Sequence, residues 1–208
     1  MADPKTGSQG YHHGNLKKVL IDSAVELISE KGAGALSLRM IARRAGVSHA
    51  APYRHFKNKK EILAAVAKQG FDMMLEETRK RISESRGNEL DHFAICGLSY
   101  IDFAVKFPAH FRVMFGTRME NSYFSEKLKP VSQPVFRLLL DSIIACQEKG
   151  LLKPGDPFRM AMSAWSIVHG FAMLRIDNHI PDREMDEQEL KKLKQNVVYT
   201  LYYGLRPE

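Results

Sequence analysis

The chain has 208 residues, of which 44% are hydrophobic and 26% charged, a composition typical of a globular protein. It contains neither an apolar run of the roughly 20 residues that cross a bilayer nor a charged-then-apolar leader, so we expect a cytoplasmic protein without a membrane partner. The two cysteines, Cys96 and Cys146, stand in no CxxC or Cys/His ligand spacing. We therefore expect small core residues rather than a disulfide or a metal site.

The net charge of +7 is concentrated at one end of the chain. Residues 1–60 contain eleven Lys/Arg and four Asp/Glu, whereas residues 61–208 contain twenty of each sign. A cationic segment joined to a neutral one predicts that the first binds a polyanion while the second has another function. A solvated basic face is the alternative for a charge run that carries no motif.

Hydrophobic residues recur with the 3.6-residue period of an α-helix along most of the chain, and no stretch alternates with the period of a strand. The sequence therefore predicts an all-α protein of about nine helices. In chain order, the predicted helices span residues 15–31, 37–45, 48–56, 59–84, 89–106, 109–115, 130–149, 157–177 and 186–203.

Capping residues define several of these boundaries. Ser37, Ser48 and Asn58 precede predicted helices and can accept hydrogen bonds from the first N–H groups. Asp156 is placed to cap the helix that Pro157 opens, where the missing N–H of proline costs nothing. These local patterns indicate where the helices start.

The segment Ser37–Phe56 carries the most specific motif of the chain. Its two short predicted helices meet at Gly46, whose backbone freedom permits a tight turn. Ala42 and Ala45 are small, and Val47 can fill the corner between the helices. Two helices crossing steeply in this way form a helix-turn-helix.

We expect this motif to bind double-stranded DNA. The leading residues of its second helix are mostly small, so the backbone can approach base edges in the major groove. Tyr53, His55 and Lys59 follow at spacings suited to phosphate oxygens, and Ser37 and Arg39 could hold the opposite backbone. The expected DNA-binding residues are Ser37, Arg39, Ser48, His49, Ala50, Ala51, Tyr53, Arg54, His55 and Lys59.

Over roughly residues 14–62 the chain resembles the TetR family, named for the tetracycline repressor. The family pattern is Ser/Thr-x-Arg-x-Ile-Ala-x-x-Ala-Gly-Val-Ser, then Tyr-x-His-Phe and a Lys-x-x-Leu-like pair. It is met by Ser37, Arg39, Ile41, Ala42, Ala45, Gly46, Val47, Ser48, Tyr53, His55, Phe56, Lys59 and Ile62. One departure is Pro52, where the family usually has an aliphatic residue and where proline removes a backbone bond to Ser48.

The resemblance implies a dimeric regulator with an N-terminal three-helix helix-turn-helix domain and a C-terminal bundle of about six helices. We place the DNA-binding domain at residues 11–60 and the ligand-sensing and dimerisation domain at residues 61–208. The segment Tyr11-His12-His13-Gly14 is interpreted as an arm that reaches DNA or fills the approach to the first helix. A metal-binding pair at His12 and His13, or a tag remnant, is the alternative.

The C-terminal part carries an apolar series at helical spacing, which core packing alone can explain. Within it, Trp165-Ser166-Ile167-Val168-His169-Gly170 resembles the Trp-x-x-x-His-Gly signature of one TetR C-terminal subfamily. The resemblance implies a ligand cavity near Trp165 and His169, and a hydrogen-bonded core histidine is the equally weighted alternative. The candidate pocket residues are Phe93, Cys96, Tyr100, Phe107, Phe111, Met114, Phe136, Leu140, Trp165, His169 and Met173.

The last two long helices are expected to pair with their counterparts in a homodimer, as the TetR architecture implies. The expected interface residues are Leu190, Leu193, Val197 and Leu201. A dimer would place two recognition helices in major grooves about 34 Å apart. A ligand that favours a more widely spread dimer would then release the DNA.

The function predicted is that of a repressor released from a palindromic operator by a small apolar or amphipathic inducer, without a cofactor. The alternative is a nucleoid or RNA-binding protein that has no specific operator. Catalysis is not expected, because the sequence has no Gly-rich phosphate loop, no Gly-x-Ser-x-Gly elbow and no His-Glu-x-x-His motif.

Overall fold

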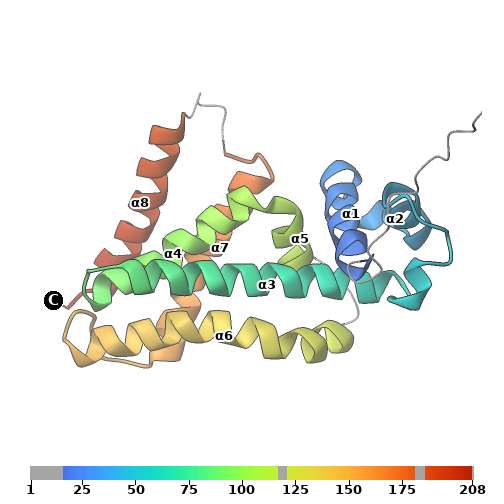
Figure 1. Ribbon diagram of the computed structural model, residues 1–208. Helices are drawn as coiled ribbons and strands as arrows, with labels where there is room; N and C mark the ends of the chain where they lie inside the picture. The colour runs from blue at the N-terminus through green and yellow to red at the C-terminus, as the bar shows by residue number, and fades with distance from the viewer. Residues whose placement is uncertain (1–15, 117–120, 181–185, 208) are drawn as a thin grey trace, which may run out of the picture. The chain divides into compact units, whose positions relative to one another are not determined.

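The computed structural model describes residues 16–116, 121–180 and 186–207. Over these ranges the chain is helical and has no strand, which confirms the predicted fold class (Figure 1). The predicted arm at Tyr11-His12-His13-Gly14 lies outside the described residues. None of the described helices combines the length and apolar character that bilayer crossing requires.

The described helices include two short 3-10 turns, labelled η. In chain order they are α1 (Leu16–Lys31), η2 (Ala33–Ala35), α2 (Leu38–Arg44), η3 (Pro52–Arg54), α3 (Lys59–Glu84), α4 (Glu89–Lys106), α5 (Pro108–Gly116), α6 (Asn121–Glu148), α7 (Pro157–Ile176) and α8 (Glu187–Leu205).

The chain divides into two compact units, residues 1–63 and 64–208, so the division falls inside α3. In the first unit, α1 packs against α2, and α2 against η3. Leu20 and Ile41 are fully buried in its core. Ser37 caps α2 as predicted, accepting a hydrogen bond from the N–H of Met40 at 3.3 Å. Gly46 has φ = +68°, a conformation that L side chains rarely adopt, so glycine makes the tight turn after α2 possible.

The second helix of the helix-turn-helix is shorter than predicted. Instead of an α-helix over residues 48–56 capped by Ser48, the chain forms a turn followed by the 3-10 helix Pro52–Arg54. The N–H of Ala51 donates to the carbonyl of Ser48 at 3.0 Å, which is 3-10 rather than α spacing. The physical reason is Pro52, because its nitrogen has no hydrogen to donate to the Ser48 carbonyl.

The second unit is organised around α4, which packs against α5, α6, α7 and α8. α7 also packs against α6 and α8. Cys146 is fully buried in this core, and both cysteines are free thiols. The largest fully buried side chains of this unit include Met74, Phe93, Ile101, Phe111, Ile143 and Leu152.

Local capping explains several helix starts in this unit, among them those of α7 and α4. Asp156 accepts a hydrogen bond from the N–H of Phe158 at 2.9 Å, with Pro157 in the first turn, as predicted. α4 begins with a capping box, in which Asn88 and Asp91 each accept a hydrogen bond from the other's backbone N–H. The helix begins at Glu89, as predicted.

The start of α6 corrects the prediction. The predicted range, residues 130–149, starts at Pro130. The structure begins α6 at Asn121, with Pro130 and Pro134 inside the helix. Each internal proline removes a backbone hydrogen bond and costs about 3 kcal/mol. Burial of α6 against α4 and α7 offsets that cost.

Candidate functional site

The residues expected to contact DNA lie mainly on the surface of the first unit. Tyr53 is the clearest case, because 53% of this aromatic residue is exposed. An aromatic ring left so accessible is free to meet a binding partner. The exposed members of the set are Arg39, Ser48, His49, Ala50, Tyr53, Arg54 and His55, and the half-buried ones are Ser37, Ala51 and Lys59.

Two residues of this set also make contacts within the chain. The Ser37 hydroxyl caps α2, as described above. The ammonium group of Lys59 donates a hydrogen bond to the carbonyl of Gly34 at 2.5 Å, which joins the start of α3 to η2. A DNA phosphate would share the Lys59 ammonium with this carbonyl, because an ammonium has three donors.

One arginine within the motif has a structural contact that the sequence did not reveal. The Arg44 guanidinium at the end of α2 lies 3.0 Å from the carboxylate of Glu26 and 2.6 Å from that of Glu30, both on α1. Its hydrogen bond lowers the pKa of Glu30. These ion pairs hold α2 against α1, so part of the basic charge of this segment serves the fold.

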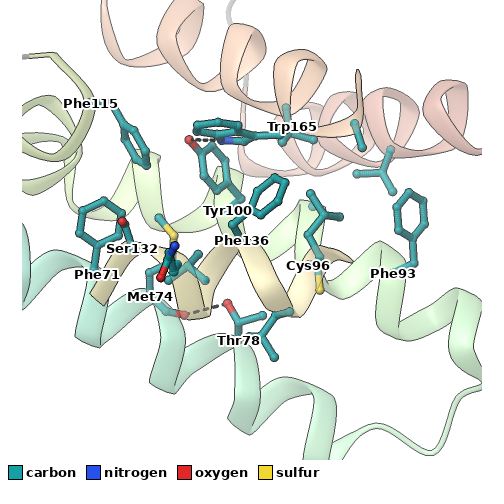
Figure 2. A pocket seen from close by; sticks show the side chains of 18 of the residues that line it. Phe71, Met74, Thr78, Phe93, Cys96, Tyr100, Phe115, Ser132, Phe136 and Trp165 are labelled. Carbon is teal, nitrogen blue, oxygen red and sulfur yellow. Dashed lines mark hydrogen bonds between the residues drawn. The ribbon is translucent and has the colours of Figure 1, made fainter. Parts of the chain in front are cut away.

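The second unit contains a partly open apolar cavity of about 240 Å³ (Figure 2). Six helices contribute to its wall, from α3 through α8. Of the eleven candidate pocket residues, the five that line it are Phe93, Cys96, Tyr100, Phe136 and Trp165. The six that do not are Phe107, Phe111, Met114, Leu140, His169 and Met173.

The residues outside the wall have other surroundings. Phe111 is fully buried, and Met114 is 8% exposed. Leu140 packs against the core cluster that contains Ile143 and Cys146. Apolar spacing identified these side chains as internal, but it did not distinguish a core position from a cavity wall.

Residues of α3, and most of those of α6, line the cavity without having been among the predicted pocket residues. Phe71, Met74 and Thr78 lie one turn apart on α3 and line the cavity. The Thr78 hydroxyl donates to the carbonyl of Met74 at 2.7 Å, which satisfies its only donor. From α6 the missed residues include Ser132, Val135, Leu138 and Leu139.

Two side chains of the Trp-x-x-x-His-Gly region, Trp165 and His169, are joined through the hydroxyl of Tyr100 on α4. The indole N–H of Trp165 donates to the Tyr100 oxygen at 3.0 Å, as Figure 2 shows. The same oxygen lies 2.7 Å from Nδ1 of His169. Thus His169 is a hydrogen-bonded residue next to the cavity, in contact with a side chain that lines it.

Burial keeps this cluster uncharged near neutral pH. It lowers the pKa of His169 from 6.5, because the imidazolium loses solvation. Burial also raises the pKa of Tyr100, because the phenolate would lose solvation. The His169 ring also stacks on Phe111, with ring centroids 5.7 Å apart and planes at 29°.

One of the four residues expected at a dimer interface is buried within its own chain. Leu201 is only 5% exposed and lines the cavity within its own chain, so a partner subunit cannot reach it. Leu190, Leu193 and Val197 are half-buried. The exposed large apolar side chains of α7 and α8 are Phe158, Met162, Ile167, Leu174, Tyr199 and Tyr203.

Two protein families match the chain. One covers most of the first unit, and the other covers most of the second unit. The bacterial regulatory proteins of the tetR family match residues 20–66, and the tetracyclin repressor-like C-terminal domain matches residues 93–193. An uncharacterized HTH-type transcriptional regulator of Bacillus subtilis, YvkB, is 26% identical over 186 residues, which are 86% of this chain and 92% of YvkB.

Solved structures share the fold over nearly the whole chain. A protein of unknown function from Rhodococcus sp. RHA1 is 28% identical with a TM-score of 0.82, covering 96% of this chain and 100% of that one. The transcriptional regulator FadR from Bacillus subtilis, in complex with stearoyl-CoA, is 21% identical with a TM-score of 0.77, covering 91% and 99%. With both family matches and these relatives in agreement, the chain belongs to the TetR family of bacterial regulatory proteins.

Proposed function

We propose that the protein is a one-component repressor, which binds a palindromic operator as a homodimer and releases it when a small ligand occupies the cavity. The observation that carries this proposal is the apolar cavity of about 240 Å³ in the unit that does not contain the helix-turn-helix. An architectural DNA-binding protein has no need of such a space, whereas a ligand sensor does.

The DNA-binding half of the proposal depends on the first unit. Its exposed residues at the motif include Arg39, Tyr53 and Arg54, which offer guanidinium and hydroxyl groups to phosphates. His49 and Ala50 stand at the exposed start of the recognition turn and would face base edges. The charge excess of residues 1–60 supports the same assignment.

The coupling between ligand and DNA would pass through α3. This helix begins at Lys59, within the first unit, and supplies Phe71, Met74 and Thr78 to the cavity wall of the second. A ligand that binds best when these three side chains have moved would shift α3 and, with it, the start of the helix. To act, the ligand must bind the DNA-free state more tightly than the DNA-bound state.

The homodimer would form through α7 and α8. Ile167 and Leu174 on α7 are 43% and 50% exposed, and Tyr199 and Tyr203 on α8 are 57% and 44% exposed. Large apolar side chains gathered on neighbouring helices are typical of a protein–protein interface. Two such helices from each subunit would make a four-helix interface with two-fold symmetry.

The class of the C-terminal domain is also part of the proposal. We assign it to the Trp-x-x-x-His-Gly subfamily, because Trp165 and His169 both hydrogen-bond the Tyr100 hydroxyl at the cavity wall. The FadR relative binds stearoyl-CoA, a molecule with a long apolar chain. An apolar cavity in this chain suits an apolar part of an inducer, and regulation of genes would place the protein in the cytoplasm.

The test is selection of bound duplexes from a random-sequence library, followed by titration of the selected site and of a random duplex across a range of salt concentrations. We expect a palindromic consensus bound at least a thousandfold more tightly than random DNA. A nucleoid protein would bind both duplexes alike, and an RNA-binding protein would prefer RNA. Either result would overturn the repressor assignment.

A further inference from the structure

We propose that the inducer enters the cavity as an uncharged molecule of about ten non-hydrogen atoms, holding one hydroxyl or carbonyl group against Tyr100. This inference rests on the proposed function, and it narrows the ligand from any apolar or amphipathic compound to a neutral one.

The wall of the cavity supports a neutral ligand. Every residue of its described lining is of an uncharged type, from aromatic and aliphatic side chains to Ser132, Gln133 and Thr78. The two titratable lining groups, Cys96 and Tyr100, remain protonated at pH 7 because burial raises the pKa of each. A carboxylate or ammonium in this space would lose its hydration without gaining a counter-charge.

The size of the ligand follows from the volume. A dry cavity of about 150 Å³ lined by apolar side chains binds benzene, which has six non-hydrogen atoms. On the same scale, the cavity of about 240 Å³ holds about ten. This is well below the eighteen carbons of the stearoyl chain that the FadR relative binds.

The polar contact follows from the valences of one hydroxyl. A phenol has one donor and two acceptor positions. The Tyr100 oxygen accepts the Trp165 N–H, and a second position is taken by Nδ1 of His169. One position is left, and it is a donor or an acceptor according to which nitrogen of His169 carries the proton. An alcohol can complete either arrangement, and a ketone completes the one that leaves a donor.

Thr78 offers the ligand no hydrogen-bond donor, because its hydroxyl donates within α3 to the carbonyl of Met74. In Figure 2 the Tyr100 hydroxyl lies beside the indole of Trp165, and Thr78 is bonded to its own helix. We assign the ligand's polar group to the open position of the Tyr100 hydroxyl, and Thr78 provides a matched control.

The chain contains one tryptophan, and this residue, Trp165, lines the cavity. Its fluorescence therefore reports occupation of the cavity directly and needs no operator DNA. The probes are 1-nonanol and 2-nonanone, which are neutral, and nonanoate and nonylamine, which are charged at pH 7.5. Stearoyl-CoA is the fifth probe, as a large anionic ligand.

We expect 1-nonanol to change Trp165 emission in a saturable manner and to bind at least tenfold more tightly than nonanoate or nonylamine. Nonanoate or nonylamine binding within threefold of 1-nonanol would overturn the inference, and so would tighter binding of stearoyl-CoA or no response to either neutral probe. These outcomes can be told apart from failure of the proposed function. If stearoyl-CoA released the protein from its selected operator, the neutral-ligand inference would be wrong while the repressor assignment would stand.

Three variants test the details, with affinities measured by calorimetry so that altered emission does not matter. Tyr100→Phe should weaken 1-nonanol binding about three- to tenfold, the loss of one hydrogen bond, while Thr78→Val leaves it unchanged. Equal losses in both variants would overturn the assignment of the hydroxyl.

Ser132→Lys adds a cation to the cavity wall and should raise nonanoate affinity at least tenfold. This variant keeps the charge argument testable if Tyr100→Phe does not fold. An unchanged nonanoate affinity in folded Ser132→Lys would count against that argument.

Discussion

The Tyr100 hydroxyl on α4 lies 2.7 Å from Nδ1 of His169 on α7, and this hydrogen bond joins two helices that pack along each other in the core of the second unit. Trp165, one turn before His169, donates to the same hydroxyl. The bond makes His169 both a structural residue and a neighbour of the cavity, so its two roles can be separated by substitution.

His169→Phe should lower the free energy of unfolding by about 1 kcal/mol, the net value of one hydrogen bond. The loss stays small because phenylalanine fills a similar volume and can keep the ring stacking on Phe111. Chemical denaturation measures the effect. Operator affinity without ligand should be unchanged, and release by ligand should be blunted. A destabilised variant with an unchanged ligand response would restrict His169 to a structural role.

The stability of the protein should fall as the pH drops below about 6.5, the pKa of an unfolded histidine. Because burial lowers the pKa of His169 in the folded state, the unfolded chain binds this proton first, and protonation favours unfolding. Denaturation midpoints from pH 8 to pH 5 should decline less steeply in His169→Phe. The control is His179→Phe, at an exposed position. Parallel pH profiles for the wild type and His169→Phe would contradict the prediction.

Lys59→Ala should weaken binding to all DNA sequences and reduce the salt dependence of log K by about one unit of slope, because one phosphate contact is lost. Tyr53→Phe should weaken operator and random duplex alike without affecting the fold, since 53% of Tyr53 is exposed. Filter binding across salt concentrations measures both. Lys68→Ala, an exposed lysine further along α3, is the control. An unchanged slope in Lys59→Ala would leave its bond to Gly34 as its only role.

Leu174→Glu combined with Ile167→Glu should give monomers that no longer bind the operator. Both side chains are exposed on α7, so the substitutions should leave the chain folded while placing charge in the proposed interface. Sedimentation velocity gives the assembly state, and circular dichroism checks the fold. Lys129→Glu, on the exposed surface of α6, makes a comparable charge change and should leave a dimer. A double variant that remained dimeric would move the interface elsewhere.

Gly70→Ala should destabilise the protein by about 1–3 kcal/mol, as overpacking does. α5 approaches α3 so closely that a Cβ on Gly70 would lie 3.2 Å from Cβ of His110 and would overlap the thioether of Met114. Gly204→Ala is the control, because a Cβ there meets nothing within 4 Å. It should be neutral or slightly stabilising, since alanine favours helix. Thermal melts that changed equally in both variants would refute the close-approach argument.

Local patterns were sufficient for much of the fold. The 3.6-residue period predicts the helices, and capping at Ser37 and Asp156 involves atoms within three residues of each other. The turn at Gly46 likewise depends on one residue's backbone freedom. Pro52 showed where the family pattern is broken, although the sequence did not predict that the recognition helix would shorten to a 3-10 turn.

Long-range packing decided the rest. Pro130 looks like a helix start in isolation, and only the burial of α6 against α4 and α7 explains a helix that continues through it. In the same way, apolar spacing shows that Leu201 and Phe111 are internal but not what they face. In the structure Leu201 lines the cavity, and Phe111 is buried in the core.

The sequence by itself determined the helical class, the helix-turn-helix and the family, because each follows from residue types at short, regular spacing. Only the tertiary structure decided which side chains enclose the cavity, that Tyr100 joins Trp165 to His169, and that Ile167 and Leu174 rather than Leu201 are left exposed. The reason is geometric: a periodic pattern marks the buried face of a helix, whereas the neighbour of each residue on that face depends on how six helices of the second unit cross.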